Sequence, residues 1–131
     1  MSAGKQSQPL TAEVFKARTG LSRILAATGY SLDGLVAAYR SEAAFRQIVW
    51  LNLLLIPLAL WITPDRIERT LLIGVVFLGL IIELLNSAIE AAVDRISMDI
   101  HPLSKRAKDM GSAAQLLGLT LVVIVWSLVL L

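Results

Sequence analysis

The stretch from Leu71 to Val93, LLIGVVFLGLIIELLNSAIEAAV, decides the fold of this chain. It is long and apolar enough to cross a bilayer as an α-helix. Yet it contains Glu83, Asn86 and Glu90. At roughly 100° per residue, these three side chains and the following Asp94 fall within an arc of about 80° on one helix face. Ionisable groups at membrane depth are costly and usually face a bundle interior, so this polar stripe predicts a functional site.

Two other apolar segments accompany this span. The first is uncharged from Ile48 to Ile62, and its helix is expected to begin earlier, near Ala43, because a span needs about 20 residues. The other, residues 110–131, carries no charge at all. Hydrophobic residues make up 56% of the chain, too many for an ordinary soluble domain of this size. We predict an all-α membrane protein, a helical bundle with three transmembrane helices at about 43–62, 71–93 and 110–131.

The segment before the first span has two parts. Residues 1–12 are polar and predicted to be disordered, and residues 13–131 are predicted to form a single domain. A weakly amphipathic pattern over 14–28 is interrupted at Gly29-Tyr30-Ser31. A clear apolar stripe with helical spacing follows: Leu32, Leu35, Val36, Tyr39 and Ala43. We interpret residues 14–42 as an amphipathic helix on the membrane surface, the alternative being a soluble helix packed on a partner.

The distribution of charge predicts the orientation in the membrane. Residues 1–47 carry six Lys or Arg, whereas residues 63–70 balance two Arg against two acids. The loop after the second span is again basic, with Arg95, Lys105, Arg106 and Lys108. The positive-inside rule therefore places the N-terminus and this second loop in the cytoplasm, and the C-terminus outside. We expect no cleaved signal peptide. The absence of cysteine excludes disulfides and thiol catalysis.

The acidic residues suggest a chemistry at the cytoplasmic end of the second span. Glu90 lies about 10 Å nearer the cytoplasm than Glu83, at a height similar to that of Glu42 just before the first span. Glu42 and Glu90 together suit a hard cation, and Lys108 and Arg23 are expected at a similar level. Carboxylates beside basic residues indicate a magnesium–phosphate site, with Glu83 taking a proton from a lipid hydroxyl.

Two classes of function remain open on these residues alone. One is a small membrane enzyme that handles phosphates, and the other is a channel or transporter with intramembrane carboxylates. The chain has no Walker A motif, no kinase glycine-rich loop and no kinase catalytic loop. In the second loop, Ser104 is expected to cap a helix that begins at Lys105. Small residues four apart, such as Ala114 and Gly118, suit close helix packing.

Three stretches resemble one known family. GYSLDGLVAAYRSEAAFRQ (29–47), IIELLNSAIEAAVDRIS (81–97) and HPLSKRAKDMGSAAQLL (101–117) are similar to the prokaryotic diacylglycerol kinases, and the resemblance covers about residues 20–131. It implies a homotrimer in the bacterial cytoplasmic (inner) membrane, with three spans and one surface helix per subunit. It also implies transfer of the γ-phosphoryl group of MgATP to the primary hydroxyl of diacylglycerol, giving phosphatidic acid, at a cytoplasmic site between subunits. No nucleic-acid partner is expected.

The resemblance also implies roles for individual residues. Glu83 would be the general base with Asn86 beside it, and Glu42 and Glu90 would hold Mg²⁺. Ser112 would lie near the lipid substrate, as would Glu83. The residues implied to contact ATP are Arg23, Tyr30, Glu42, Glu90, Asp99, His101, Lys108 and Asp109.

Some positions depart from the family pattern. Enteric members carry an acid where this chain has Ile48, and more bases on the surface helix where it has Ala26, Asp33 and Val36. A related group phosphorylates undecaprenol and shares the carboxylates, so an undecaprenol kinase is the alternative. The SAIEAAVDR stretch and the GSAA after AKDM resemble the diacylglycerol branch more.

Overall fold

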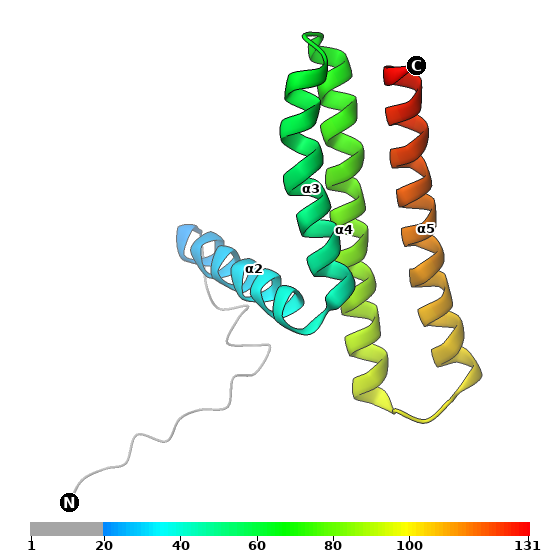
Figure 1. Cartoon of the computed structure of the whole chain (residues 1–131). Helices are drawn as coiled ribbons and strands as arrows, with labels where there is room; N and C mark the ends of the chain where they lie inside the picture. Colours follow the sequence, from blue (N-terminus) through cyan, green and yellow to red (C-terminus); the bar gives the residue numbers. More distant parts are fainter. Residues whose placement is uncertain (1–19) are drawn as a thin grey trace, which may run out of the picture. The chain divides into compact units, whose positions relative to one another are not determined.

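The computed structural model describes residues 20–131, and all regular structure in that range is helical. The helices are α2 (Leu21–Ser41), α3 (Ala43–Ile62), α4 (Arg66–Ile96) and α5 (Pro102–Leu130) (Figure 1). The predicted all-α class is therefore confirmed. The disorder predicted for residues 1–12, and the start of the surface helix at residue 14, lie outside the described residues. The chain divides into two compact units, Met1–Gly34 and Leu35–Leu131, and α3, α4 and α5 belong to the second.

Helix α2 runs without a break, so the interruption predicted at Gly29-Tyr30-Ser31 is wrong. A glycine inside a helix costs only about 1 kcal/mol, which the flanking helix formers offset. Ser31 Oγ also donates a hydrogen bond to the Ala27 carbonyl within the helix, at 2.9 Å. Most of the large apolar side chains that α2 exposes lie along one face: Leu21, Ile24, Leu25, Leu32, Leu35, Val36 and Tyr39. Such a stripe suits a membrane surface, and that placement stays a prediction.

Helices α3, α4 and α5 are each long and apolar enough to cross a membrane, which confirms the three predicted spans. Helix α4 extends beyond the predicted span at both ends, because it begins at Arg66 and ends at Ile96. Its first turn is capped by Asp65, whose carboxylate accepts hydrogen bonds from the backbone N–H groups of Ile67 and Glu68, both at 2.9 Å. The chain is thus a multi-pass membrane protein.

Helix α5 begins at Pro102, so the start predicted at Lys105 with a Ser104 cap is wrong. His101 is the N-cap residue instead, and its Nδ1 accepts a hydrogen bond from the backbone N–H of Leu103 at 3.1 Å. Proline is favoured in the first turn of a helix, because it has no N–H to leave unpaired there. The helix therefore extends three residues further toward the loop than we expected.

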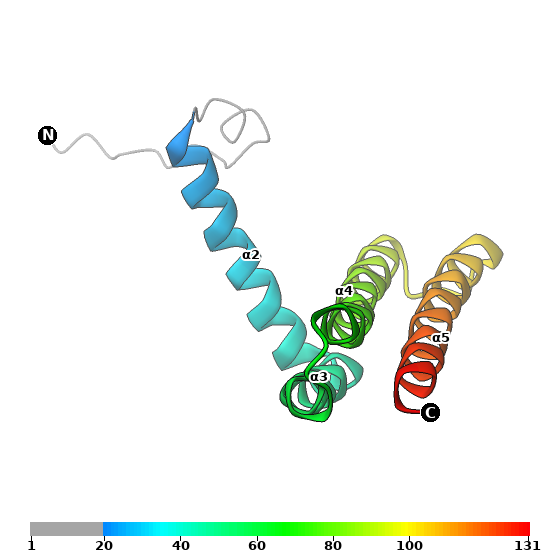
Figure 2. The same ribbon diagram turned by 90° about the horizontal axis from the view of Figure 1, so that it is seen from above.

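Helix α4 packs against both α3 and α5 (Figures 1 and 2). The short α3–α4 turn and the C-terminal end of α5 lie at one end of these three helices, and the α4–α5 loop lies at the other. We call these the turn end and the loop end. The buried apolar core comprises Ala59, Leu72, Val75, Val76, Val122 and Trp126. This core belongs to the turn-end half, so the polar stripe of α4 occupies the half toward the loop end.

Candidate active site

The polar stripe of α4 faces the interior, as predicted. Glu83 is the most deeply placed member and is only 5% exposed. Asn86, Glu90 and Asp94 follow along the helix and are each half-buried. The stripe therefore leads from a buried carboxylate to partly open groups at the loop end.

Two glycines of α5 allow this helix to lie close to the stripe. A Cβ atom at Gly111 would collide with Oδ1 of Asn86. A Cβ atom at Gly118 would lie only 2.9 Å from Cδ1 of Ile82. Small residues let helix backbones approach each other in membranes, so a larger residue at either position would have to displace the end of the Asn86 or Ile82 side chain. The sequence pattern had indicated Gly118 but not Gly111, which the spacing of seven residues could have revealed.

Two other carboxylates, Glu42 and Glu90, influence Glu83 electrostatically. Glu42 is the N-cap residue of α3 and is half-buried. The charges of Glu42 and Glu90 both act on Glu83, so the α2–α3 junction brings Glu42 near α4. Arg46 holds this junction, because its Nη1 donates to the carbonyls of Tyr39 at 2.9 Å and Arg40 at 3.1 Å. The electrostatic influence of Glu42 and Glu90 on Glu83 is compatible with the predicted pairing of Glu42 with Glu90, which stays a prediction.

Lys108 brings a positive charge from α5 to the loop end of the stripe. Its Nζ forms an ion pair with Oδ1 of Asp94 at 2.5 Å, and the charge of Glu90 also acts on it. Asn86 links the deeper groups to this level, because its Nδ2 donates to Oε1 of Glu90 at 3.3 Å. One basic side chain, Lys108, therefore lies beside the acidic groups Glu90 and Asp94 at the loop end of the α4–α5 interface. Positive charge beside carboxylates is compatible with binding a metal–phosphate group.

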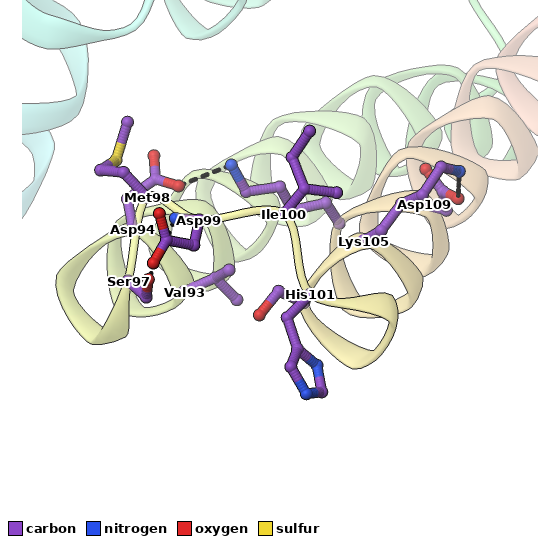
Figure 3. A pocket seen from close by; sticks show the side chains of 11 residues that line it. Val93, Asp94, Ser97, Met98, Asp99, Ile100, His101, Lys105 and Asp109 are labelled. Atoms are coloured by element: carbon purple, nitrogen blue, oxygen red, sulfur yellow. Dashed lines mark hydrogen bonds and ion pairs between the residues drawn. The ribbon is translucent and has the colours of Figure 1, made fainter.

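A pocket of about 330 Å³ opens beside Lys108 at the loop end (Figure 3). Four of the residues implied to contact ATP line it: Asp99, His101, Lys108 and Asp109. Asp109 also forms an ion pair with Lys105 at 2.5 Å. The His101 ring is turned away from Asp94 in Figure 3, and its Nδ1 caps α5. The structure thus brings four predicted nucleotide residues to one opening.

Other predicted site residues lie elsewhere. Arg23 and Tyr30 belong to the first unit, and their contacts with a nucleotide stay predictions. Ser112 is exposed on α5, next to Gly111. Within residues 20–131 no three acidic or histidine side chains are arranged as metal ligands.

Gln115 is a buried polar residue that the sequence pattern did not single out. Its side chain is 9% exposed, and both its Oε1 and its Nε2 are buried without a hydrogen-bond partner. It stands between Gly111 and Gly118 on the buried face of α5. The signal available in the sequence was its spacing, four and three residues from the two glycines.

The fold and this site together define an integral membrane protein with a carboxylate and lysine cluster at one end of its spans. Residues 29–130 match the profile of the family described as prokaryotic diacylglycerol kinase. The chain is 62% identical over 117 residues to a diacylglycerol kinase of Pseudomonas aeruginosa, covering 89% of this chain and 95% of the relative.

Two further relatives are also diacylglycerol kinases. A diacylglycerol kinase of Escherichia coli is 54% identical over 112 residues, covering 86% of this chain and 92% of the relative. One of Helicobacter pylori is 50% identical over 107 residues, covering 82% and 84% respectively. The chain therefore belongs to the prokaryotic diacylglycerol kinase family, as its motifs predicted.

Proposed function

We propose that this protein transfers the γ-phosphoryl group of ATP to the primary hydroxyl of diacylglycerol and releases phosphatidic acid and ADP. Membership of the family supports the activity. The observation that carries the site is the polar stripe of α4, which runs from the buried Glu83 through Glu90 to Asp94, where Lys108 of α5 forms an ion pair. A lipid kinase needs this combination of a base at membrane depth and phosphate-binding groups at the surface.

Glu83 acts as the general base in this proposal. Its carboxylate takes the proton from the lipid hydroxyl while the hydroxyl oxygen forms a bond to the γ-phosphorus and the bond to ADP breaks. A base must lie within hydrogen-bond reach of the proton it removes, so the hydroxyl of the bound lipid must reach the depth of Glu83. Asn86 contacts the same hydroxyl and holds Glu90 through its Nδ2. Ser112 lies beside the lipid on α5.

Mg²⁺ fits the donor set at Glu42 and Glu90. Mg²⁺ prefers oxygen ligands, keeps several waters and is commonly held by one or two carboxylates together with substrate phosphates. The two carboxylates act on the same buried neighbour, Glu83, and are therefore close to one place. When bound, the cation neutralises charge on the phosphoryl group that is transferred.

The nucleotide occupies the pocket at the α4–α5 loop. Lys108 contacts the phosphates there, and Asp94 holds its ammonium group in position through their ion pair. Asp99, His101 and Asp109 line the same opening. Arg23 and Tyr30 contact the nucleotide from the surface helix.

The protein works as a homotrimer in the bacterial inner membrane, with its N-terminus in the cytoplasm and its C-terminus outside. The basic residues before α3 and in the α4–α5 loop support this orientation. The loop-end pocket then opens to cytoplasmic ATP. A reporter fused after Leu131 that is active only in the cytoplasm would overturn the orientation and remove the pocket from its substrate.

A labelled-ATP assay on the purified protein tests the proposed reaction. Diacylglycerol and undecaprenol are offered side by side in mixed micelles at equal surface concentration. We expect label in phosphatidic acid at a rate well above that in undecaprenyl phosphate. Preferential labelling of undecaprenol would support the alternative kinase, and no labelling of either lipid would overturn a lipid kinase.

A further inference from the structure

Gln115 is buried on α5 between Gly111 and Gly118, next to the candidate active site, but it takes part in none of the ion pairs or hydrogen bonds of that site. Both polar atoms of its amide lack a partner within the described residues. An amide carries two N–H donors and one carbonyl acceptor, and burying them unpaired is unfavourable, most of all inside a membrane. A polar side chain kept at such a position calls for a partner that it meets during function.

The register of α5 against α4 places Gln115 opposite Glu83. Gly111 faces Asn86, and the Cβ position of Gly118 lies 4.0 Å from the Cα atom of Gly79. The two helices run in opposite directions, so Gln115 lies between these two contacts on α5 and Glu83 lies between them on α4.

The rise of an α-helix gives their levels. From the Gly111–Asn86 contact, Gln115 lies about 6 Å along its helix and Glu83 about 4.5 Å, at 1.5 Å per residue. From the Gly118–Gly79 contact, the corresponding values are about 4.5 Å and about 6 Å. Both counts place Glu83 about 1.5 Å nearer the loop end than Gln115.

Both side chains also belong to the faces that meet. On α4, Leu72, Gly79 and Glu83 are buried at helical spacing, and Leu72 and Gly79 contact α5. On α5, the buried row includes Gly111, Gln115 and Gly118. The Oε1 atom of Gln115 lies 3.7 Å from the Cβ position of Gly118, so the amide lies within this interface. Gln115 and Glu83 therefore lie at nearly the same level, each on the buried face of its helix.

We infer that Gln115 is a positioning residue for Glu83. The Nε2–H group has no partner in the part of the chain that the structure describes. When the lipid binds, the Gln115 side chain rotates so that this group donates a hydrogen bond to one carboxylate oxygen of Glu83, and the second oxygen stays directed toward the lipid hydroxyl. A hydrogen bond to a charged group is stronger than one between neutral groups, so this contact holds the carboxylate firmly in one orientation. The inference rests on the proposed role of Glu83 as the base.

Gln115→Met separates positioning from a purely structural role, because methionine keeps the length of the side chain and removes its donors. Replacing an unpaired buried amide with an apolar side chain of similar shape is neutral or stabilising if the role is structural. For a positioning residue, we expect kcat to fall about tenfold, with the KM values for ATP and diacylglycerol unchanged and folding intact, as the loss of one charged hydrogen bond predicts.

Asn52→Leu is the matched control. Asn52 is also a buried amide, 5% exposed, but it belongs to α3, and its Nδ2 donates to the Ile48 carbonyl at 2.9 Å. We expect this variant to keep the wild-type kcat. An equal loss in both variants would overturn the inference, because any buried amide would then have the same effect.

A double-mutant cycle with Glu83→Asp completes the test. Shortening the base moves the carboxylate away from the amide, so Gln115→Met should lower the rate less than twofold in that background. Full additivity, or a wild-type kcat for Gln115→Met, overturns the positioning role and leaves the base in place. The base itself is tested separately by Glu83→Gln, whose retention of more than a tenth of the activity would remove Glu83 from the mechanism.

Discussion

The two halves of the α4–α5 interface are built by the same pair of helices but differ in chemistry. Toward the turn end the contact is apolar, and the Trp126 indole N–H finds an acceptor in the Leu72 carbonyl at 3.3 Å. Toward the loop end the helices bury Glu83 and Gln115, and the Oδ1 atom of Asn86 is also left without a partner among the described residues. One half satisfies its polar groups, and the other leaves some of them unpaired.

This difference separates stability from chemistry along one interface. Apolar packing with satisfied hydrogen bonds stabilises a helix pair, whereas unpaired polar groups at membrane depth destabilise it. Natural proteins depart from good packing mainly at functional sites. We therefore expect substitutions at the turn end to change folding and substitutions at the loop end to change the reaction.

The largest effect on the reaction is expected for Glu83→Gln. A general base contributes roughly 10²- to 10⁴-fold, and an amide cannot accept the proton, so phosphoryl transfer should fall by about this factor. MgATP binding and folding should be preserved. Glu68→Gln is the matched control, because Glu68 lies on the same helix near the turn end and accepts a hydrogen bond from Thr63. The labelled-ATP assay compares Glu83→Gln with Glu68→Gln. Equal rates for the two variants would contradict the assignment of the reaction to the loop-end half.

Trp126→Ala should show the opposite behaviour. Removing a buried aromatic side chain typically costs about 3–5 kcal/mol of stability, and this change also leaves the Leu72 carbonyl without its donor. The kcat of the folded fraction should stay near wild type. Unfolding in mixed micelles measures the loss, and Trp61→Ala, whose side chain is 84% exposed, serves as the control with a much smaller expected effect.

Substituting either proposed metal ligand, Glu42 or Glu90, should change the Mg²⁺ dependence of the reaction more than its diacylglycerol dependence. Glu42→Gln or Glu90→Gln removes one of the two proposed protein ligands. The Mg²⁺ concentration for half-maximal activity should therefore rise by about tenfold, as is typical of losing a group that supports a metal site. The diacylglycerol saturation curve should shift little. An unchanged Mg²⁺ titration combined with a large shift in the lipid curve would remove both residues from the metal site.

The smallest effect is expected where the two helices touch near the stripe. In Gly111→Ala the new methyl group must displace the end of the Asn86 side chain, which can rotate, so we expect a severalfold loss of kcat with little loss of stability. Gly74→Ala adds the same methyl group on α4, where nothing lies within 4 Å. Equal rates for the two variants would show that the position of Asn86 does not matter.

The local features of this chain could be predicted from the sequence, because hydrophobic length and helical spacing act within one element. The spans of α3, α4 and α5 and the inward-facing stripe at Glu83 followed from such patterns. The start of α5 did not, because a histidine capping through its ring nitrogen is rarer than a serine cap. The spacing of Gln115 from Gly111 and Gly118 could have placed it on the buried face of α5. What that face meets depends on the register between two helices, which no single segment encodes.

The most direct test of separate roles for the two halves is a double-mutant cycle between Glu83→Gln and Trp126→Ala. Glu83 lies about 16 Å along α4 from Leu72, the contact of Trp126, so their effects should be independent. We predict that the changes in the free energy of unfolding add to within about 0.5 kcal/mol, and that only Glu83→Gln lowers kcat. A coupling above about 1 kcal/mol, or a loss of kcat in Trp126→Ala comparable to that in Glu83→Gln, would contradict this account.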